Sequence, residues 1–200
     1  KYRKNNELNN WIKKDPILRL RKKLSNKKIY KLEDFNKLFS LGIEKVSVSS
    51  LLFEKPELVK KAVSIYGSQS IVATLDVNQS KFRKKYQVFT HSGKRKCKYT
   101  PVDAAQYACG LGVGEIIINT IHREGTWSGF DDELIKQVSE YVDVPVVASG
   151  GAGSLDDIES VVINAHASAI ALGSMSVFQA KDMGVLIKFP KISELKKILP

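Results

Sequence analysis

Apolar, strand-like segments alternate with amphipathic helical segments along most of this chain of 200 residues. Strands buried in a parallel sheet are almost continuously apolar, and helices connect each strand to the next. This alternation predicts an α/β protein built on a parallel sheet. The predicted strands are residues 45–49, 70–77, 115–120, 144–148 and 168–172, with a hairpin over 86–94. The predicted helices begin at Leu32 and span 56–66, 101–111, 131–141 and 155–164.

One segment recurs after 123 residues. The letters LEDF at 32–35, followed by a strand that runs to Ser50, match LDDI at 155–158, followed by a strand that runs to Gly173. A duplicated half-barrel produces a repeat of this kind.

Basic residues are concentrated at one end of the chain. The formal net charge is +11, and residues 1–31 carry twelve of the 32 Lys and Arg residues but two of the 21 Asp and Glu residues. We therefore expect a basic N-terminal segment, 1–28, ahead of a globular part, 29–200. Basic ends bind nucleic acid through phosphate contacts, but they are more often simply solvated, so nucleic acid is not an expected partner.

Composition excludes several classes of protein. Apolar residues make up 43% of the chain and charged residues 26%, as in ordinary globular proteins. No apolar run reaches the roughly 18 residues of a membrane-spanning helix, so no membrane association is expected. Cys97 and Cys109 lack the spacing of a metal or redox site, so we expect a reducing, cytoplasmic setting with no metal or cofactor. The chain opens with Lys1 rather than Met, as expected of a piece of a longer product.

A carboxylate lies at the C-terminal end of one predicted strand. Asp76 follows a mostly apolar run, and functional groups in parallel barrels lie at such strand ends. A partly buried Asp at this place is suited to proton transfer. The alternative interpretation is a helix cap or a solvated turn residue.

Glycine-containing turns follow two neighbouring strands. The turn SGGAG at 149–153 stands between a strand and a helix, and Gly173-Ser174 follows the next strand. Glycines let backbone N–H groups approach an anion, and a helix N-terminus favours negative charge. The two turns predict a phosphate site, and the alternative is that both are ordinary tight turns. The polar loop from His122 to Thr126 adds an imidazole and a carboxylate, and Trp127 covers either this loop or a ligand.

Longer motifs follow the order and spacing of one known family. They are KVSVSS at 45–50, YGSQ at 66–69, Asp76, GEI at 114–116, REGTWSGFD at 123–131 and ASGGAG at 148–153. Over about residues 29–190 the chain resembles the cyclase subunit of imidazole glycerol phosphate synthase, an enzyme of histidine biosynthesis. The tail from Gly173 is similar to a paralogous branch associated with amidation of surface sugars.

The resemblance implies a TIM-type (β/α)8 barrel that closes an imidazole ring on a bis-phosphorylated ribulosyl substrate. Ammonia for this reaction comes from a glutaminase subunit, which forms a heterodimer with the barrel. Asp76 matches one of two aspartates that act as general acid and base. Lys45 and Glu115 match two charged residues at the ammonia entrance.

The resemblance also implies two phosphate clamps. The residues that match one clamp are Gly151, Ala152, Gly173 and Ser174, with Gly125 beside them. Ser49 and Ser50 fall in the other clamp, where the family has Asn-Thr.

The N-terminal part departs from the family. Nothing in residues 1–28 resembles the first strand with its catalytic Asp, the glycine turn of the second clamp falls on 26–29, and His122 and Glu124 stand where Asp is usual. We therefore expect an incomplete barrel that lacks the first strands. Two other functions are left open: a paralogue that channels ammonia for amidation of a surface-polysaccharide sugar, and a non-catalytic remnant that binds phosphate or a partner.

Overall fold

The computed structural model describes residues 31–80 and 85–199. The chain divides into two compact units, Lys1–Gly42 and Ile43–Pro200. The predicted basic segment 1–28, its boundary with the globular part, and the positions 26–29 lie outside the described residues.

Within the first unit, the described residues form the helix α3 (Leu32–Ser40). Its first turn is closed by the Asp34 carboxylate, which accepts a hydrogen bond of 2.9 Å from the backbone N–H of Lys31. The chain leaves the helix through Gly42, which has a φ of +84°. The helix therefore begins and ends where the sequence predicts.

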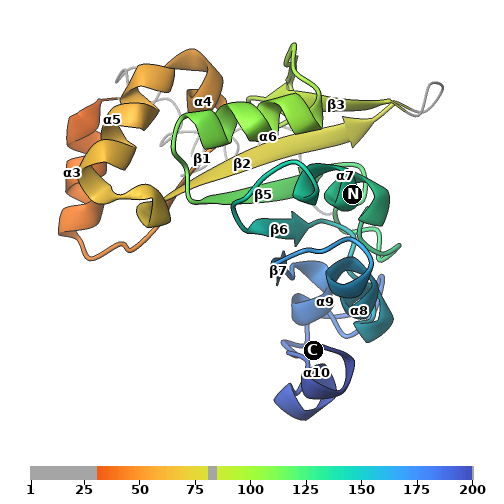
Figure 1. Ribbon diagram of the computed structural model, residues 1–200. Helices are drawn as coiled ribbons and strands as arrows, with labels where there is room; N and C mark the ends of the chain where they lie inside the picture. The colour runs from red at the N-terminus through yellow and green to blue at the C-terminus, as the bar shows by residue number, and fades with distance from the viewer. Residues whose placement is uncertain (1–30, 81–84, 200) are drawn as a thin grey trace, which may run out of the picture. The chain divides into compact units, whose positions relative to one another are not determined.

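Five parallel strands form the sheet of the second unit, in the order β1, β2, β5, β6, β7 (Figure 1). Their bounds are β1 (Val46–Val48), β2 (Ile71–Gln79), β5 (Glu115–Thr120), β6 (Val146–Ser149) and β7 (Ala169–Ala171). The predicted hairpin is present as β3 (Tyr86–Thr90) and β4 (Arg95–Lys96), with β3 antiparallel to β2. The strand β2 is longer than predicted because its last residues pair with β3.

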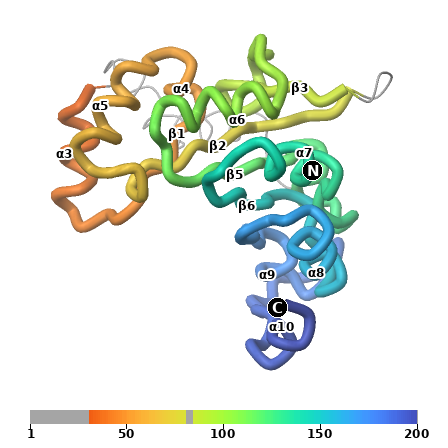
Figure 2. Tube along the Cα trace, in the orientation of Figure 1, coloured from red at the N-terminus to blue at the C-terminus, as the bar shows by residue number. Residues whose placement is uncertain are grey.

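Helices connect the parallel strands in turn, as the Cα trace in Figure 2 shows from β2 through α6 to β5. Their bounds are α4 (Ser50–Glu54), α5 (Pro56–Tyr66), α6 (Pro101–Gly110), α7 (Asp132–Ser139), α8 (Leu155–Ile163), α9 (Ser174–Val177) and α10 (Ile192–Ile198), with a 3₁₀ turn at Ser68–Ser70. The side chains of Thr100, Asp131 and Ser154 cap α6, α7 and α8 by accepting backbone N–H bonds. The short helices α4, α9 and α10 were not predicted, because four to seven residues are too few to show a helical period.

The two faces of the sheet differ in burial. On one face, alternate residues of the central strands are fully buried, among them Leu75, Val77, Ile116 and Ile118. Helices α5 and α6 contact β2 on the sheet, and α7 contacts β6. The other face carries the intervening residues, which are half-buried or exposed over most of its area. This second face is where the candidate functional residues lie.

The internal repeat appears in the structure with matching bounds. Helices α3 and α8 each have nine residues, and strands β1 and β7 each have three. Each pair starts 123 residues apart, at positions 32 and 155 for the helices and 46 and 169 for the strands. The repeat thus predicted the local structure of both copies.

No helix among the described residues is long and apolar enough to cross a membrane.

The turn between α6 and β5 gives a test of close packing. A Cβ on Gly114 would lie 2.5 Å from the backbone oxygen of Ser68, whereas one on Gly110 would meet nothing within 4 Å. We expect Gly114→Ala to lower the free energy of unfolding by about 1–3 kcal/mol. Gly110→Ala, at the last residue of α6, should raise it by about 0.5–1 kcal/mol. Urea denaturation of the two variants measures both changes, and equal midpoints would contradict this packing.

Candidate active site

A row of hydrogen-bonded polar side chains crosses the carboxyl-end part of the sheet. The strand register pairs Asp76 with Asn119 and Asn119 with Ser149. The Asn119 amide nitrogen donates to Asp76 Oδ1 at 2.9 Å, and the Ser149 hydroxyl donates to Asn119 Oδ1 at 3.5 Å. Asp76 is half-buried and lies within β2, so it is not a helix cap. The sequence drew attention to Asp76 but not to Asn119, whose place follows only from the register.

A small pocket lined by glycines follows β6 and β7. Its lining residues are Glu124, Gly125, Gly150, Gly151, Ala152, Ala171, Gly173 and Ser174. This glycine pocket therefore brings together the five residues predicted for one phosphate clamp. Ala171 is paired with Ser149, so the pocket continues the row that begins at Asp76. The sequence had singled out Glu124 for its carboxylate but had not placed it in the pocket.

Close approach of two loops requires glycine at the centre of the pocket. Gly151 has a φ of +104°, and a Cβ there would overlap the backbone oxygen of Gly129. The Gly129 N–H in turn donates to the Gly151 carbonyl at 2.9 Å. The turn after β6 is thereby fixed to the loop between β5 and α7.

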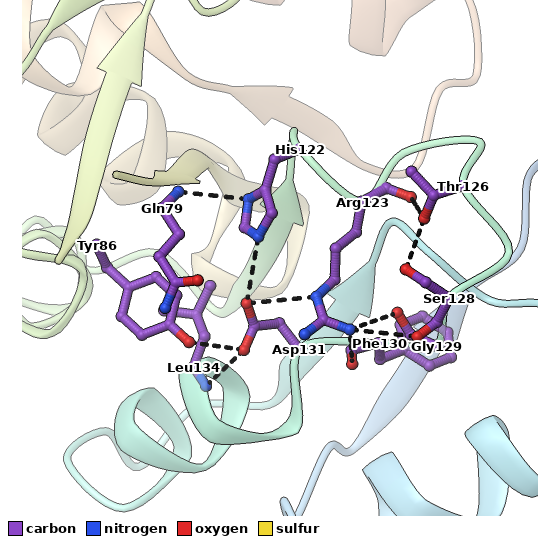
Figure 3. Close-up of polar contacts among 10 residues, drawn as sticks. All are labelled: Gln79, Tyr86, His122, Arg123, Thr126, Ser128, Gly129, Phe130, Asp131 and Leu134. Carbon is purple, nitrogen blue, oxygen red and sulfur yellow. Dashed lines mark hydrogen bonds and ion pairs between the residues drawn. The ribbon is translucent and has the colours of Figure 1, made fainter. Parts of the chain in front are cut away.

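This β5–α7 loop is organised around the buried carboxylate of Asp131 (Figure 3). Asp131 Oδ1 accepts hydrogen bonds from the Tyr86 hydroxyl at 2.8 Å and from the Leu134 N–H at 3.3 Å. Its Oδ2 has no hydrogen-bond partner among the described residues, but Arg123 Nε lies 3.6 Å and His122 Nε2 3.7 Å away. One carboxylate thus connects the β3 hairpin, the loop and the start of α7.

Arg123 holds the far side of the same loop. Its Nη1 donates to the carbonyl oxygens of Ser128, Gly129 and Phe130 at 3.1–3.3 Å. Because the guanidinium turns toward these carbonyls, it does not line the glycine pocket. Arg123 is therefore a residue that shapes the loop.

Burial is the main cause of the pKa shifts of two titratable groups around Asp131, Tyr86 and His122. Burial and the hydrogen bond to Asp131 raise the pKa of the Tyr86 phenol, so it stays protonated as a donor. Burial lowers the pKa of His122, outweighing the attraction of Asp131, while Arg123 lowers it further. The Gln79 N–H donates to His122 Nδ1 at 3.3 Å, which places the proton of the neutral ring on Nε2.

At the other end of the same sheet face, Lys45 and Glu115 form an ion pair. Lys45 Nζ lies 2.6 Å from Glu115 Oε2, with side chains 53% and 23% exposed. In the strand register, Val72 of β2 lies between Ser47 on one side and Glu115 on the other. Lys45 is two residues before Ser47, so the Lys45–Glu115 ion pair reaches across β2. The sequence predicts both residues at the N-terminal ends of strands, and in the structure their side chains are in contact as an ion pair. An exposed pair of this kind contributes about 0–1 kcal/mol to stability, so stability alone does not explain it.

The residues predicted for the second clamp lie after β1. Ser49 precedes α4 and Ser50 begins it, and the Ser50 hydroxyl accepts the His91 N–H at 2.8 Å. In the sheet, β2, β5 and β6 separate β1 from β7. Ser49 and Ser50 therefore share the carboxyl edge with the glycine pocket but do not line it.

Trp127 lines a separate cavity of about 190 Å³. Other residues of its wall include Gly153, Met175 and Lys188. Trp127 has a φ of +60°, and a Cβ on Gly153 would lie 2.8 Å from its backbone oxygen. Trp127 does not line the glycine pocket. Among the described residues, no group of three His, Cys, Asp or Glu side chains is placed to hold a metal ion.

Parallel strands joined by helices, with polar groups at their carboxyl ends, define a TIM-barrel-like α/β protein. The chain matches the histidine biosynthesis protein family over residues 29–181 and belongs to that family.

Known relatives agree with this assignment. The "Putative imidazole glycerol phosphate synthase subunit HisF" of Leptospira interrogans is 35% identical over 162 residues, which are 81% of this chain and 64% of the relative. The protein of the same name from Leptospira borgpetersenii is 33% identical over 196 residues, covering 94% and 77%. A Pseudomonas aeruginosa relative named as subunit hisF2 is 39% identical over 164 residues, covering 82% and 65%. The chain thus spans just under two thirds of the length of the Leptospira interrogans and Pseudomonas proteins.

The lowered pKa of His122 predicts a pH-dependent stability. Below about pH 6.5 the unfolded chain takes up a proton on this ring that the folded chain binds less readily, so stability is lost as the pH falls. Between pH 7.5 and 5.5 the wild type should therefore lose more stability than His122→Asn, whose amide oxygen can still accept a hydrogen bond from the Gln79 N–H. Urea unfolding at several pH values tests this, and parallel curves for the two proteins would contradict it.

Proposed function

We propose that this chain acts as the cyclase subunit of an imidazole glycerol phosphate synthase. It would use ammonia to close an imidazole ring on a bis-phosphorylated ribulosyl substrate. The observation that carries the proposal is the hydrogen-bonded row from Asp76 to Ser149, which continues into the glycine pocket along one face of the sheet. The family membership and the names of the relatives support the same reaction.

Asp76 is the proposed acid–base group. Its Oδ1 accepts the Asn119 amide, which fixes the plane of the carboxylate, and Oδ2 would take or return the proton. Ser149 orients Asn119 through its amide oxygen. Asn119 is thus a positioning residue for a carboxylate beside the substrate.

The glycine pocket is the proposed site for one substrate phosphate. Its wall consists of glycines, alanines and Ser174 together with Glu124, so backbone N–H groups and the Ser174 hydroxyl are the donors available to an anion there. Ser49 and Ser50, after β1, are the proposed contacts for the second phosphate. Their separation from the pocket by three strands suits a substrate with a phosphate at each end.

The Lys45–Glu115 pair is the proposed gate for ammonia. It lies on the face that carries Asp76 but at the amino ends of the strands. We expect a glutaminase subunit to dock at this end in a cytoplasmic heterodimer and release ammonia there. A charged pair that opens and closes would admit ammonia while keeping bulk water out.

Replacing Asp76 tests the acid–base role. We expect Asp76→Asn to lower ammonia-dependent turnover by about 10²–10⁴-fold, because the amide cannot take the proton. Substrate loss and imidazole product are followed with ammonium salts as the nitrogen source. Asp156→Asn, the same exchange at an exposed position on α8, is the matched control and should leave turnover unchanged.

Retained turnover in Asp76→Asn would contradict the role of this residue. Absence of any imidazole product from the wild-type chain would contradict the cyclase proposal. In that case, glutaminase-dependent ammonia transfer to a sugar would favour the amidation paralogue. Phosphate binding without glutaminase association would favour a binding role.

Replacing Lys45 tests the gate. In the presence of the glutaminase, Lys45→Ala should lower glutamine-dependent turnover several-fold, while turnover with added ammonium salt stays near the wild-type value. Lys136→Ala, at an exposed position on α7, should change neither rate. Equal loss with both nitrogen sources would contradict a gating role and indicate a structural one.

A further inference from the structure

The Glu124 side chain lies inside the glycine pocket. A Cβ built on Gly150 would lie 3.4 Å from Glu124 Oε2, and one built on Gly173 would lie 3.3 Å from Oε1. The carboxylate therefore sits between the turn after β6 and the turn after β7. These are the two turns that form the proposed phosphate site.

With the carboxylate in this position, little space remains. The pocket has a free volume of about 10 Å³. A space of that size holds about one water molecule and not the five atoms of a phosphate group. A phosphate monoester would therefore compete with the Glu124 side chain for the space between the two turns.

The negative charge of Glu124 also opposes the binding of phosphate in the pocket. Of the pocket's lining residues in the described chain, Glu124 alone is charged. Two negative groups a few ångströms apart repel each other strongly at the edge of a protein. The neighbouring guanidinium of Arg123 donates to loop carbonyls and so does not line the pocket with a compensating positive charge.

Glu124 is free to move. Its residue is exposed, and no hydrogen bond or ion pair holds its carboxylate among the described residues. The chain before it is fixed by Arg123, and Gly125 after it has a φ of +70°. A rotation of the side chain alone would therefore open the pocket without moving the loop.

We propose that Glu124 is an intramolecular competitor of phosphate, which occupies the glycine pocket until its side chain turns outward. This inference rests on the proposed phosphate site. It makes Glu124 a residue that sets substrate affinity rather than a catalytic residue.

The test measures the Kd of inorganic phosphate for the full chain and three variants by calorimetry. Glu124→Ala removes bulk and charge and should bind phosphate roughly tenfold or more tightly than the wild type. Glu124→Gln removes charge and keeps bulk, so its gain should be smaller. Glu159→Ala, which removes an exposed carboxylate on α8, should leave the Kd unchanged and controls for net charge.

Urea midpoints of the variants verify that each is folded. Equal Kd values for the wild type and Glu124→Ala would overturn the competitor role while leaving the phosphate site in place. An equal gain in Glu159→Ala would overturn it too, as an effect of overall charge. Absence of binding in all four folded proteins would instead overturn the proposed phosphate site.

Discussion

The in-register parallel pairing of β2, β5, β6 and β7 places Asp76, Asn119, Ser149 and Ala171 side by side on one face of the sheet. The hydrogen bonds from Ser149 to Asn119 and from Asn119 to Asp76 follow from that register, as does the position of the glycine pocket beside Ala171. A slip of one residue in any strand would turn its side chains to the helix-covered face. The helices hold the register by burying the alternate residues, such as Ile116 and Ile118.

The loop after β5 depends on a second constraint, the buried carboxylate of Asp131. Through Tyr86 and the N-terminus of α7, this carboxylate holds the loop between the β3 hairpin and the sheet. Arg123 then shapes the loop from inside, and the Gly129–Gly151 contact sets it against the turn after β6. The glycine pocket is lined by Glu124 and Gly125 of this loop and by residues that follow the aligned strands β6 and β7.

Much of this arrangement could be predicted from the sequence, and the rest could not for physical reasons. Strand β5 has the predicted bounds because three consecutive isoleucines lie at its centre, between a glycine and a polar loop. The extension of β2 was missed because it depends on pairing with β3. Asn119 and the anchoring role of Asp131 were missed because their partners lie 43 and 45 residues away in sequence. Glu124 was noticed as a carboxylate, but no local pattern says that a side chain fills a pocket formed by two other turns.

The most direct measurement is a titration of the full chain with a phosphate monoester, followed through the amide signals of its NMR spectrum. If the carboxyl-end face is the substrate site, the backbone signals of Gly125, Gly151 and Ser174 and the side-chain amide of Asn119 shift together with one Kd. Shifts confined to exposed lysines, or to the covered face of the sheet, would contradict a substrate site on this face.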